Sequence, residues 1–354
     1  MRWWGGADGA KQIGARNNAT SSSTVGIARD VHAHNRRCLP HMRIIITGAS
    51  GILGRSLLRL LSAAAADKNY TLLGLAYSRA TPPLQKVDLC DEAATKAVIE
   101  EFKPDIVVHC AAERFPDKVD ADPDRAKTLN VGACERLAAA CADCGAALVY
   151  ISTDYVFDGG VKTGVYPPYD TDAPPNPINF YGETKRAGEI AVLAVQAAHP
   201  CVLRVPVLYA YDQETLAESA SLVVAEALKG SSSEPKLIDD WGVRFPTACD
   251  DVSEAIRLII EAKREDKAKI TGIYHCSSPE RSTKYSQSLL MAKVLGLPSE
   301  HLKPNGEPPS GAPRPQNTQL DCSSTWAALG GKPQFKSLEE GFARALAPFK
   351  GEFV

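Results

Sequence analysis

The sequence has 354 residues, of which 44% are hydrophobic and 23% are charged, and its formal net charge is -2. This balance is typical of a globular protein of one or two domains, and it excludes a wholly disordered chain and a strongly basic nucleic-acid binder. Because no apolar run reaches about 18 residues, we expect no membrane-spanning helix. Ten cysteines without a repeated spacing favour a reducing, cytoplasmic location over a disulfide framework.

The first 41 residues differ from the remainder of the chain. They contain six basic and two acidic residues, and the stretch from Asn17 to Thr24 is polar and aperiodic. We therefore expect residues 1–41 to form a disordered extension before an ordered part that begins at Met42. The Arg-rich, acid-poor composition also suits a mitochondrial presequence, which stays open as the alternative.

After Met42, short β-branched runs alternate with segments of helical periodicity. Strands are expected at 43–46, 71–76, 106–110, 148–152 and 202–205, and helices at 51–61, 92–102, 126–142 and 181–195. This alternation predicts a doubly wound α/β fold, in which helices cover both faces of a parallel sheet. Elements beyond residue 207 are shorter. The expected domains are a Rossmann domain at 42–207 and a smaller substrate-type lobe at 208–354 that can interleave with it.

A glycine-rich turn separates the first strand from the first helix. Gly48, Gly51 and Gly54 allow the backbone to turn tightly and to approach a pyrophosphate, whose charge meets the amide groups at the helix N-terminus. The position of the turn, after a β-branched strand and inside a βαβ unit, predicts a dinucleotide site. Its Gly-x-x-Gly-x-x-Gly spacing is similar to that of the short-chain dehydrogenase/reductase superfamily.

The residues after the second strand bear on which dinucleotide binds. An NAD site usually has an acid there, which holds the ribose 2′-hydroxyl. This sequence has Tyr77, Ser78 and Arg79 instead. A guanidinium can pair with a 2′-phosphate through its planar fork of donors, so we expect NADP. A solvated surface arginine is the alternative interpretation of Arg79.

A second group of residues suggests reactive chemistry. Tyr181 and Lys185 are one helical turn apart, so that their side chains lie on one face of a helix. The ordinary pKa of a phenol is about 10, and a neighbouring ammonium lowers it towards the range that is useful for proton transfer. Thr153 follows the fourth strand, where the superfamily places a hydroxyl that polarises the substrate carbonyl. We expect these three residues to be catalytic if the protein is an enzyme. For Asp154 three roles stay open: it orients the substrate, it serves as an auxiliary acid, or it only forms a turn.

The remaining histidine and cysteine patterns do not predict a catalytic base, a metal site or a redox motif. His109 ends the third predicted strand, and we expect it to be a buried or wall residue and not a base. No cluster of His, Cys and acidic residues has metal-ligand spacing, so no metal site is expected. Cys141 and Cys144 form a C-x-x-C pair at the end of a predicted helix, without the strand context of a thioredoxin-like motif.

Four longer motifs narrow the resemblance. Residues 150–159 (YISTDYVFDG) resemble the signature of dTDP-4-dehydrorhamnose reductases. Residues 107–114 (VVHCAAER), 244–247 (RFPT) and 314–323 (RPQNTQLDCS) are more similar to one branch of that group, the regulatory β subunits of methionine adenosyltransferase. The resemblance covers the chain from residue 43 to residue 349.

This resemblance implies a reductase fold that keeps its dinucleotide site but acts in S-adenosylmethionine biosynthesis, as the partner of a catalytic methionine adenosyltransferase subunit. Neither a membrane nor a nucleic acid is an implied partner. Together with Gly48 of the glycine turn, matching positions imply NADP contacts at Ser50, Gly51, Ile52, Leu53, Tyr77, Ser78, Arg79, Asp88, Leu89, Cys110, Arg114, Tyr181, Lys185 and Leu208. The family has a second basic residue at the position of Ser78, which predicts a weaker clamp on the phosphate here.

Three functions stay open from the sequence. One is an NADP-binding regulatory subunit without its own catalysis, and the second is an NADP-dependent reductase of a keto-sugar nucleotide. The third is a redox-sensing binder that has neither the partner nor the substrate. The motifs at 244–247 and 314–323 favour the first. In the family a tail after a Pro-Phe pair docks in the catalytic subunit, and we expect a shorter tail here because only residues 350–354 follow Pro348 and Phe349.

Overall fold

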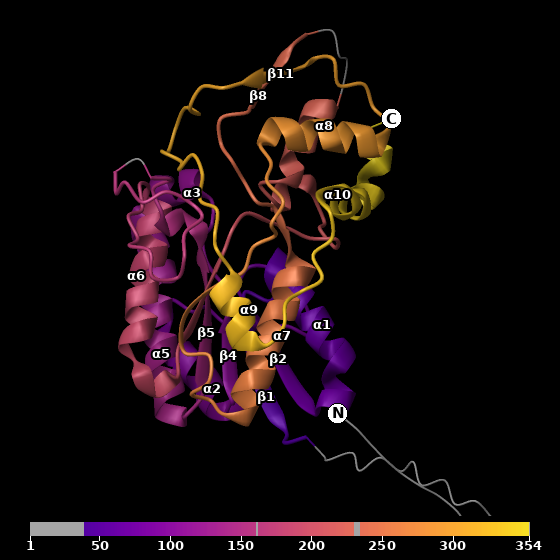
Figure 1. Cartoon of the computed structure of the whole chain (residues 1–354). Helices are drawn as coiled ribbons and strands as arrows, with labels where there is room; N and C mark the ends of the chain where they lie inside the picture. The colour runs from indigo at the N-terminus through magenta and orange to yellow at the C-terminus, as the bar shows by residue number, and fades with distance from the viewer. Residues whose placement is uncertain (1–38, 161, 230–233, 354) are drawn as a thin grey trace, which may run out of the picture. The chain divides into compact units, whose positions relative to one another are not determined.

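The computed structural model describes residues 39–160, 162–229 and 234–353, so that residues 1–38 of the expected extension lie outside the described residues. A parallel sheet lies at the centre between layers of helices (Figure 1). It has seven strands in the order β10-β6-β5-β4-β1-β2-β3. The strands are β1 (Met42–Thr47), β2 (Tyr70–Ala76), β3 (Gln85–Lys86), β4 (Ile106–His109), β5 (Ala147–Thr153), β6 (Cys201–Val205) and β10 (Gly272–His275). This architecture confirms the predicted doubly wound α/β fold.

Helices cover both faces of the sheet. They are α1 (Ile52–Lys68) and α7 (Cys249–Glu265) on one face, and α2 (Glu92–Phe102), α5 (Ala133–Cys144) and α6 (Phe180–Ala194) on the other. Ile44 and Ile46 of β1 pack towards α1 and α7, whereas Ile45 packs into the opposite core. Successive residues of a strand point to opposite faces. The uninterrupted apolar run in β1 is therefore explained by burial on both sides.

The strand order reverses at β1, which places a crevice beside the glycine-rich turn. The chain runs outward from β1 to β2 and β3, and then crosses to β4 on the other side of β1. In doubly wound sheets, ligands bind at such a reversal, outside the carboxyl ends of the strands. Because α1 begins directly after β1, its N-terminus lies at this crevice.

The predicted helix at 126–142 is interrupted in the structure. A short α4 (Pro123–Lys127) leads into a π-helix (Thr128–Gly132) and then into α5. Inside the π-helix, the buried Asn130 amide accepts a hydrogen bond from the Glu113 amide at 2.9 Å and donates to Thr184 Oγ1 at 3.1 Å. The wider turn therefore joins the loop after β4 to α6, a role that apolar periodicity does not reveal. Single π turns are frequent at functional sites.

The chain after residue 207 builds a second core and also returns to the sheet. Its remaining elements are β7 (Leu208–Tyr209), β8 (Lys236–Asp239), β9 (Thr247–Ala248), β11 (Leu302–Asn305), α8 (Lys284–Leu295), α9 (Ser323–Leu329) and α10 (Leu338–Leu346). Leu222, Met291 and Phe342 belong to the second core. Since β10 pairs with β6 and α7 packs on α1, the two parts of the chain interleave. The division at residue 207 stays a prediction.

Within the described ranges, no helix combines the length and the apolar character that crossing a membrane requires. The remaining short helix before the π-helix is α3 (Pro116–Ala121), which follows the loop after β4. That loop carries Cys110, Glu113 and Arg114, and it forms one side of the crevice beside β1.

Candidate functional site

A cavity of about 1030 Å³ lies at the carboxyl ends of the parallel strands. Every residue that the sequence predicted for cofactor binding or catalysis lines it: Gly48, Ser50, Gly51, Ile52, Leu53, Tyr77, Ser78, Arg79, Asp88, Leu89, Cys110, Arg114, Thr153, Tyr181, Lys185 and Leu208. They follow different strands, and they meet because the carboxyl ends of parallel strands share one edge of the sheet. Which atoms of a ligand each residue contacts stays a prediction.

The glycine-rich turn has the geometry of a phosphate cradle. Gly48 has φ +65, and a Cβ atom there would lie 2.7 Å from the backbone nitrogen of Ala111. Gly51 is the N-cap of α1 and provides no side-chain cap, whereas Asp91 and Asn179 cap α2 and α6. The first turn of α1 also contains no acid. Its amide groups are therefore available to an anion, and the cradle fits a pyrophosphate.

The predicted catalytic residues lie together, but the electrostatics of Tyr181 differ from the expectation. Lys185 is buried, its Nζ donates to the Ile151 carbonyl at 2.7 Å and lies 4.1 Å from the centre of the Tyr150 ring. Burial lowers the pKa of Lys185 to about 8. Burial also raises the pKa of Tyr181, and a hydrogen bond with Thr153 offsets this only in part. The net shift is therefore upwards and not downwards as expected, and the ammonium of Lys185 contacts the Ile151 carbonyl and the Tyr150 ring.

Asp154 links the end of β5 to a distant segment. Thr153 Oγ1 donates to Asp154 Oδ1 at 3.1 Å, and Thr318 Oγ1 donates to Asp154 Oδ2 at 2.5 Å. Burial raises the pKa of Asp154 to about 6, although the two hydroxyl groups oppose this rise. Thr318 is 164 residues from Asp154 in the sequence. The 314–323 motif therefore supports a carboxyl group at the cavity.

The 244–247 and 314–323 motifs contact each other where both line the cavity. The Arg244 guanidinium donates to the carbonyl groups of Pro315 and Gln316, each at 3.1 Å. Arg244 and Arg314 line the cavity together with Lys284, whose pKa is lowered by burial. The two motifs therefore build one wall, which is richer in basic groups than the sequence indicated. Lys284 lies outside both motifs, and no signal in the sequence pointed to it.

His109 lies behind this cavity and does not line it. It is 1% exposed, its Nδ1 is 2.7 Å from Thr47 Oγ1, and its ring stacks on Tyr150. Burial lowers the pKa of His109 to about 3, so that the ring is neutral. The expectation of a buried residue is confirmed. Among residues 39–160, 162–229 and 234–353, no three His, Cys, Asp or Glu side chains are grouped as a metal ion would require.

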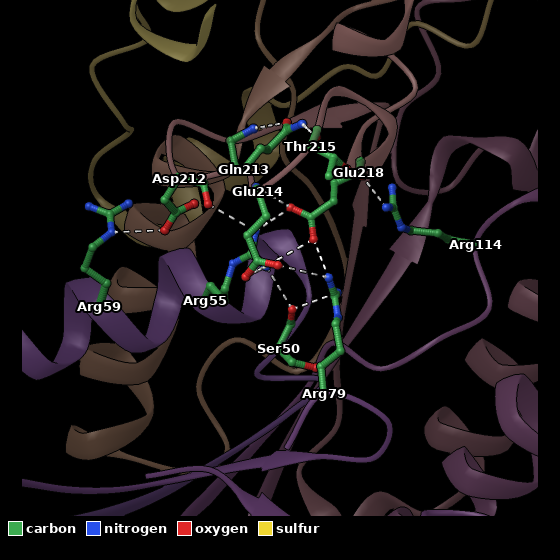
Figure 2. A network of polar contacts seen from close by, with 11 residues as sticks. Ser50, Arg55, Arg59, Arg79, Arg114, Asp212, Gln213, Glu214, Thr215 and Glu218 are labelled. Carbon is green, nitrogen blue, oxygen red and sulfur yellow. Dashed lines mark hydrogen bonds and ion pairs between the residues drawn. The ribbon is translucent and has the colours of Figure 1, made fainter. Parts of the chain in front are cut away.

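Arg79, which was predicted to bind a 2′-phosphate, pairs with a carboxylate at the edge of the cavity (Figure 2). Its guanidinium contacts Glu218 Oε1 at 2.5 Å and the Ser50 carbonyl at 2.9 Å. Arg55 holds the other oxygen of Glu218 at 2.7 Å, and Arg114 donates to the backbone carbonyl of Glu218. We call residues 212–218 the acidic strap. The sequence analysis did not identify this strap.

A second arginine–carboxylate cluster lies inside the protein, where α6, β5 and β6 meet. Arg204 donates to both oxygens of Glu189, each at 2.8 Å, and both side chains are 0% exposed. Ser152 and Arg186 complete the set of donors at 2.6 and 2.8 Å. Burial would raise the pKa of Glu189, but its hydrogen bonds and the nearby charge of Arg204 lower it. The cluster ties α6 to β6 one helical turn beyond Lys185.

Comparison with known proteins supports the predicted resemblance. The family described as RmlD substrate binding domain matches residues 42–349. The chain is 43% and 45% identical to proteins named methionine adenosyltransferase 2 subunit beta from Xenopus tropicalis and Xenopus laevis, over 88% of this chain and 89% of each relative. It is 32% identical to a dTDP-4-dehydrorhamnose reductase from Mycolicibacterium smegmatis, over 90% of both chains.

A solved structure shares the fold and holds a dinucleotide. It is dTDP-4-dehydrorhamnose reductase from Bacillus anthracis in complex with NADP. It superposes with a TM-score of 0.70 at 25% identity, and the match covers 87% of this chain and 99% of that one. These findings confirm the resemblance that the sequence motifs predicted.

Proposed function

Because the chain belongs to the family of methionine adenosyltransferase 2 β subunits, we propose that it is an NADP-binding regulatory subunit of a methionine adenosyltransferase, without turnover of its own. The observation that supports this most strongly is the 43% to 45% identity to two such β subunits. It extends over 88% of the chain, and therefore over both of its interleaved parts. The 244–247 and 314–323 motifs support the proposal, since they contact each other and form one wall of the cavity.

The partner is tested by association with a catalytic methionine adenosyltransferase subunit. The two purified proteins should co-elute in size-exclusion chromatography, and the rate of S-adenosylmethionine synthesis should change when this chain is added. The control is the chain alone, which should produce no S-adenosylmethionine. Separate elution at micromolar concentrations, with an unchanged rate of synthesis, would overturn the regulatory proposal.

The cofactor part of the proposal assigns NADP to the cavity. In this assignment the glycine cradle would hold the pyrophosphate, Lys185 would contact the nicotinamide ribose, and Arg79 would donate to the 2′-phosphate; all of these residues line the cavity. Three features support this choice. The positions after β2 carry no acid, the cradle fits a pyrophosphate, and a related reductase holds NADP. When bound, a nicotinamide supplies hydride chemistry, while the residues of this chain bind it and orient it.

A reductase is the second candidate function, because the residues that such an enzyme would use face the same cavity. Thr153 and Tyr181 lie beside Asp154, and a reductase is among the relatives at 32% identity. In this function Tyr181 would transfer a proton to the carbonyl oxygen of a keto-sugar nucleotide. The phenol is protonated at neutral pH, which is the form that a donor needs, although its raised pKa makes it a weaker acid than an ordinary phenol.

Tyr181→Phe separates the two functions, because it removes the proton and keeps the ring. A regulatory subunit should keep its association with the catalytic subunit, since a partner does not need that proton. A reductase should lose roughly 10²–10⁴-fold in turnover, the usual contribution of a positioned general acid. The assay follows NADPH oxidation with dTDP-4-dehydrorhamnose, with association measured in parallel. A wild-type protein that reduces the sugar and binds no partner would replace the first proposal with the second.

A further inference from the structure

The acidic strap places a carboxylate on the arginine that the cofactor proposal assigns to the 2′-phosphate. Glu218 Oε1 lies 2.5 Å from Nη1 of Arg79, and Glu218 Oε2 lies 2.7 Å from Nη2 of Arg55 (Figure 2). The side chain of Glu218 is 10% exposed, whereas that of Arg79 is 49% exposed. The buried partner is therefore the carboxylate, and the exposed donor is the arginine at the cavity edge.

A phosphate and this carboxylate compete for the same donors. A guanidinium pairs with carboxylate and with phosphate through the same fork of N–H groups. A 2′-phosphate brought to Arg79 would also approach Glu218, and like charges at such distances oppose each other. NAD has a hydroxyl at this position and needs no pairing with Arg79. The carboxylate therefore opposes only the dinucleotide that carries the extra phosphate.

We propose that Glu218, which lies beside the cavity and pairs with Arg79 of its lining, is a specificity-determining residue: it competes with the 2′-phosphate of NADP for Arg79 and so reduces the preference for NADP over NAD. This inference rests on the cofactor assignment in the proposed function. No acid is next to Arg79 in the sequence, and yet its guanidinium is already paired with a carboxylate in the structure. Its partner comes from 139 residues further along the chain. The proposal gives this pairing a role.

The strap has other anchors than the Glu218 carboxylate, so that a variant should keep its shape. Arg114 donates to the backbone carbonyl of Glu218, and Leu216 is buried in the second core. The side-chain amide of Gln213 accepts from the Ala210 amide at 3.0 Å and donates to the Thr215 carbonyl at 3.1 Å. Glu218→Gln keeps the size of the side chain and one acceptor oxygen, and it removes the charge.

The test is isothermal titration of NADP and NAD into the full-length wild type and into Glu218→Gln. We expect Glu218→Gln to bind NADP about ten-fold tighter, because a charged carboxylate no longer competes with the phosphate for Arg79. NAD affinity should change by less than about two-fold. The matched control is Glu214→Gln on the same strap. Its carboxylate is 66% exposed and 3.4 Å or more from the arginines, so that we expect little change for either ligand.

A double variant identifies Arg79 as the contested group. In the Arg79→Ala background, Glu218→Gln should no longer improve NADP binding, whereas a merely structural effect of the strap would persist. Three results overturn the inference: NADP and NAD affinities that rise together, an unchanged ratio, or weaker NADP binding in Glu218→Gln. If neither dinucleotide binds the wild type or the variants, then the cofactor proposal has failed, and this inference fails with it.

Discussion

The Arg204–Glu189 pair and the Arg79–Glu218 pair use the same two chemical groups in opposite surroundings. The first is fully buried and has every carboxylate oxygen held by side chains of α6, β5 and β6. The second joins an arginine that is 49% exposed to a carboxylate on the strap at the cavity edge. Both carboxylates have a lowered pKa, since hydrogen bonds to arginine outweigh the opposing effect of burial.

The difference lies in what can replace each partner. No anion from solution can reach Arg204, so that its pair with Glu189 is fixed once the protein has folded. Arg79 lines a cavity of about 1030 Å³, where a phosphate can take the place of the carboxylate. An ion pair therefore helps to hold the fold together when both partners are buried from solvent. It can contribute to ligand selectivity when one partner faces a ligand site.

Glu189→Gln should have the largest effect on stability. It leaves the Arg204 charge buried without a counter-charge, and removal of one partner of a buried pair costs about 3–5 kcal/mol of the free energy of unfolding. Denaturant unfolding followed by fluorescence measures this loss. Glu218→Gln is the matched variant, and it should cost less than Glu189→Gln, because Arg79 is 49% exposed and water can take the place of the carboxylate beside it. Equal losses in the two variants would break the comparison.

Arg79→Ala should have an intermediate effect that is confined to the ligand. NADP affinity should fall by about ten-fold, since the lost bond to a phosphate is worth roughly 1.5–3 kcal/mol before the competing carboxylate is counted. NAD affinity and the melting temperature should stay nearly unchanged. Arg59→Ala is a suitable control, because Arg59 pairs with Asp212 and Asp250 and does not line the cavity. An equal loss in both variants would indicate a general charge effect.

The smallest expected effect is a dependence on pH. Burial would raise the pKa of Glu218, but hydrogen bonds from Arg55, Arg79 and the Glu214 amide lower it from 4.5 to about 2. When folding lowers the pKa of an acid, the folded protein gains stability at any pH above the pKa of the unfolded state. This stability is lost as the pH falls through the pKa of the folded state. The difference in melting temperature between wild type and Glu218→Gln should therefore shrink between pH 5 and about pH 2. A difference that grows on acidification would contradict this assignment.

Local sequence patterns predicted five of the seven strands and the residues of the cavity, whereas the short β3 and β10 were missed. The glycine turn lies directly between β1 and α1, and the residues at the strand ends are brought together by the topology alone. The Arg79–Glu218 pair was not predictable, since 139 residues separate its partners and no motif connects them. The π-helix at Thr128–Gly132 was also missed. Its five residues continue the helical periodicity, and only the contacts of Asn130 distinguish them.

The last strand of the sheet has a consequence for synthesis of the chain. Between its emergence and that of β10, β6 is an edge strand with unpaired backbone groups and five buried residues. Exposed edges of this kind can pair with other chains and aggregate. β10 (Gly272–His275) covers this edge only after the intervening segment has been made. The nascent protein must therefore wait for a distant piece of its own sequence before its sheet is protected.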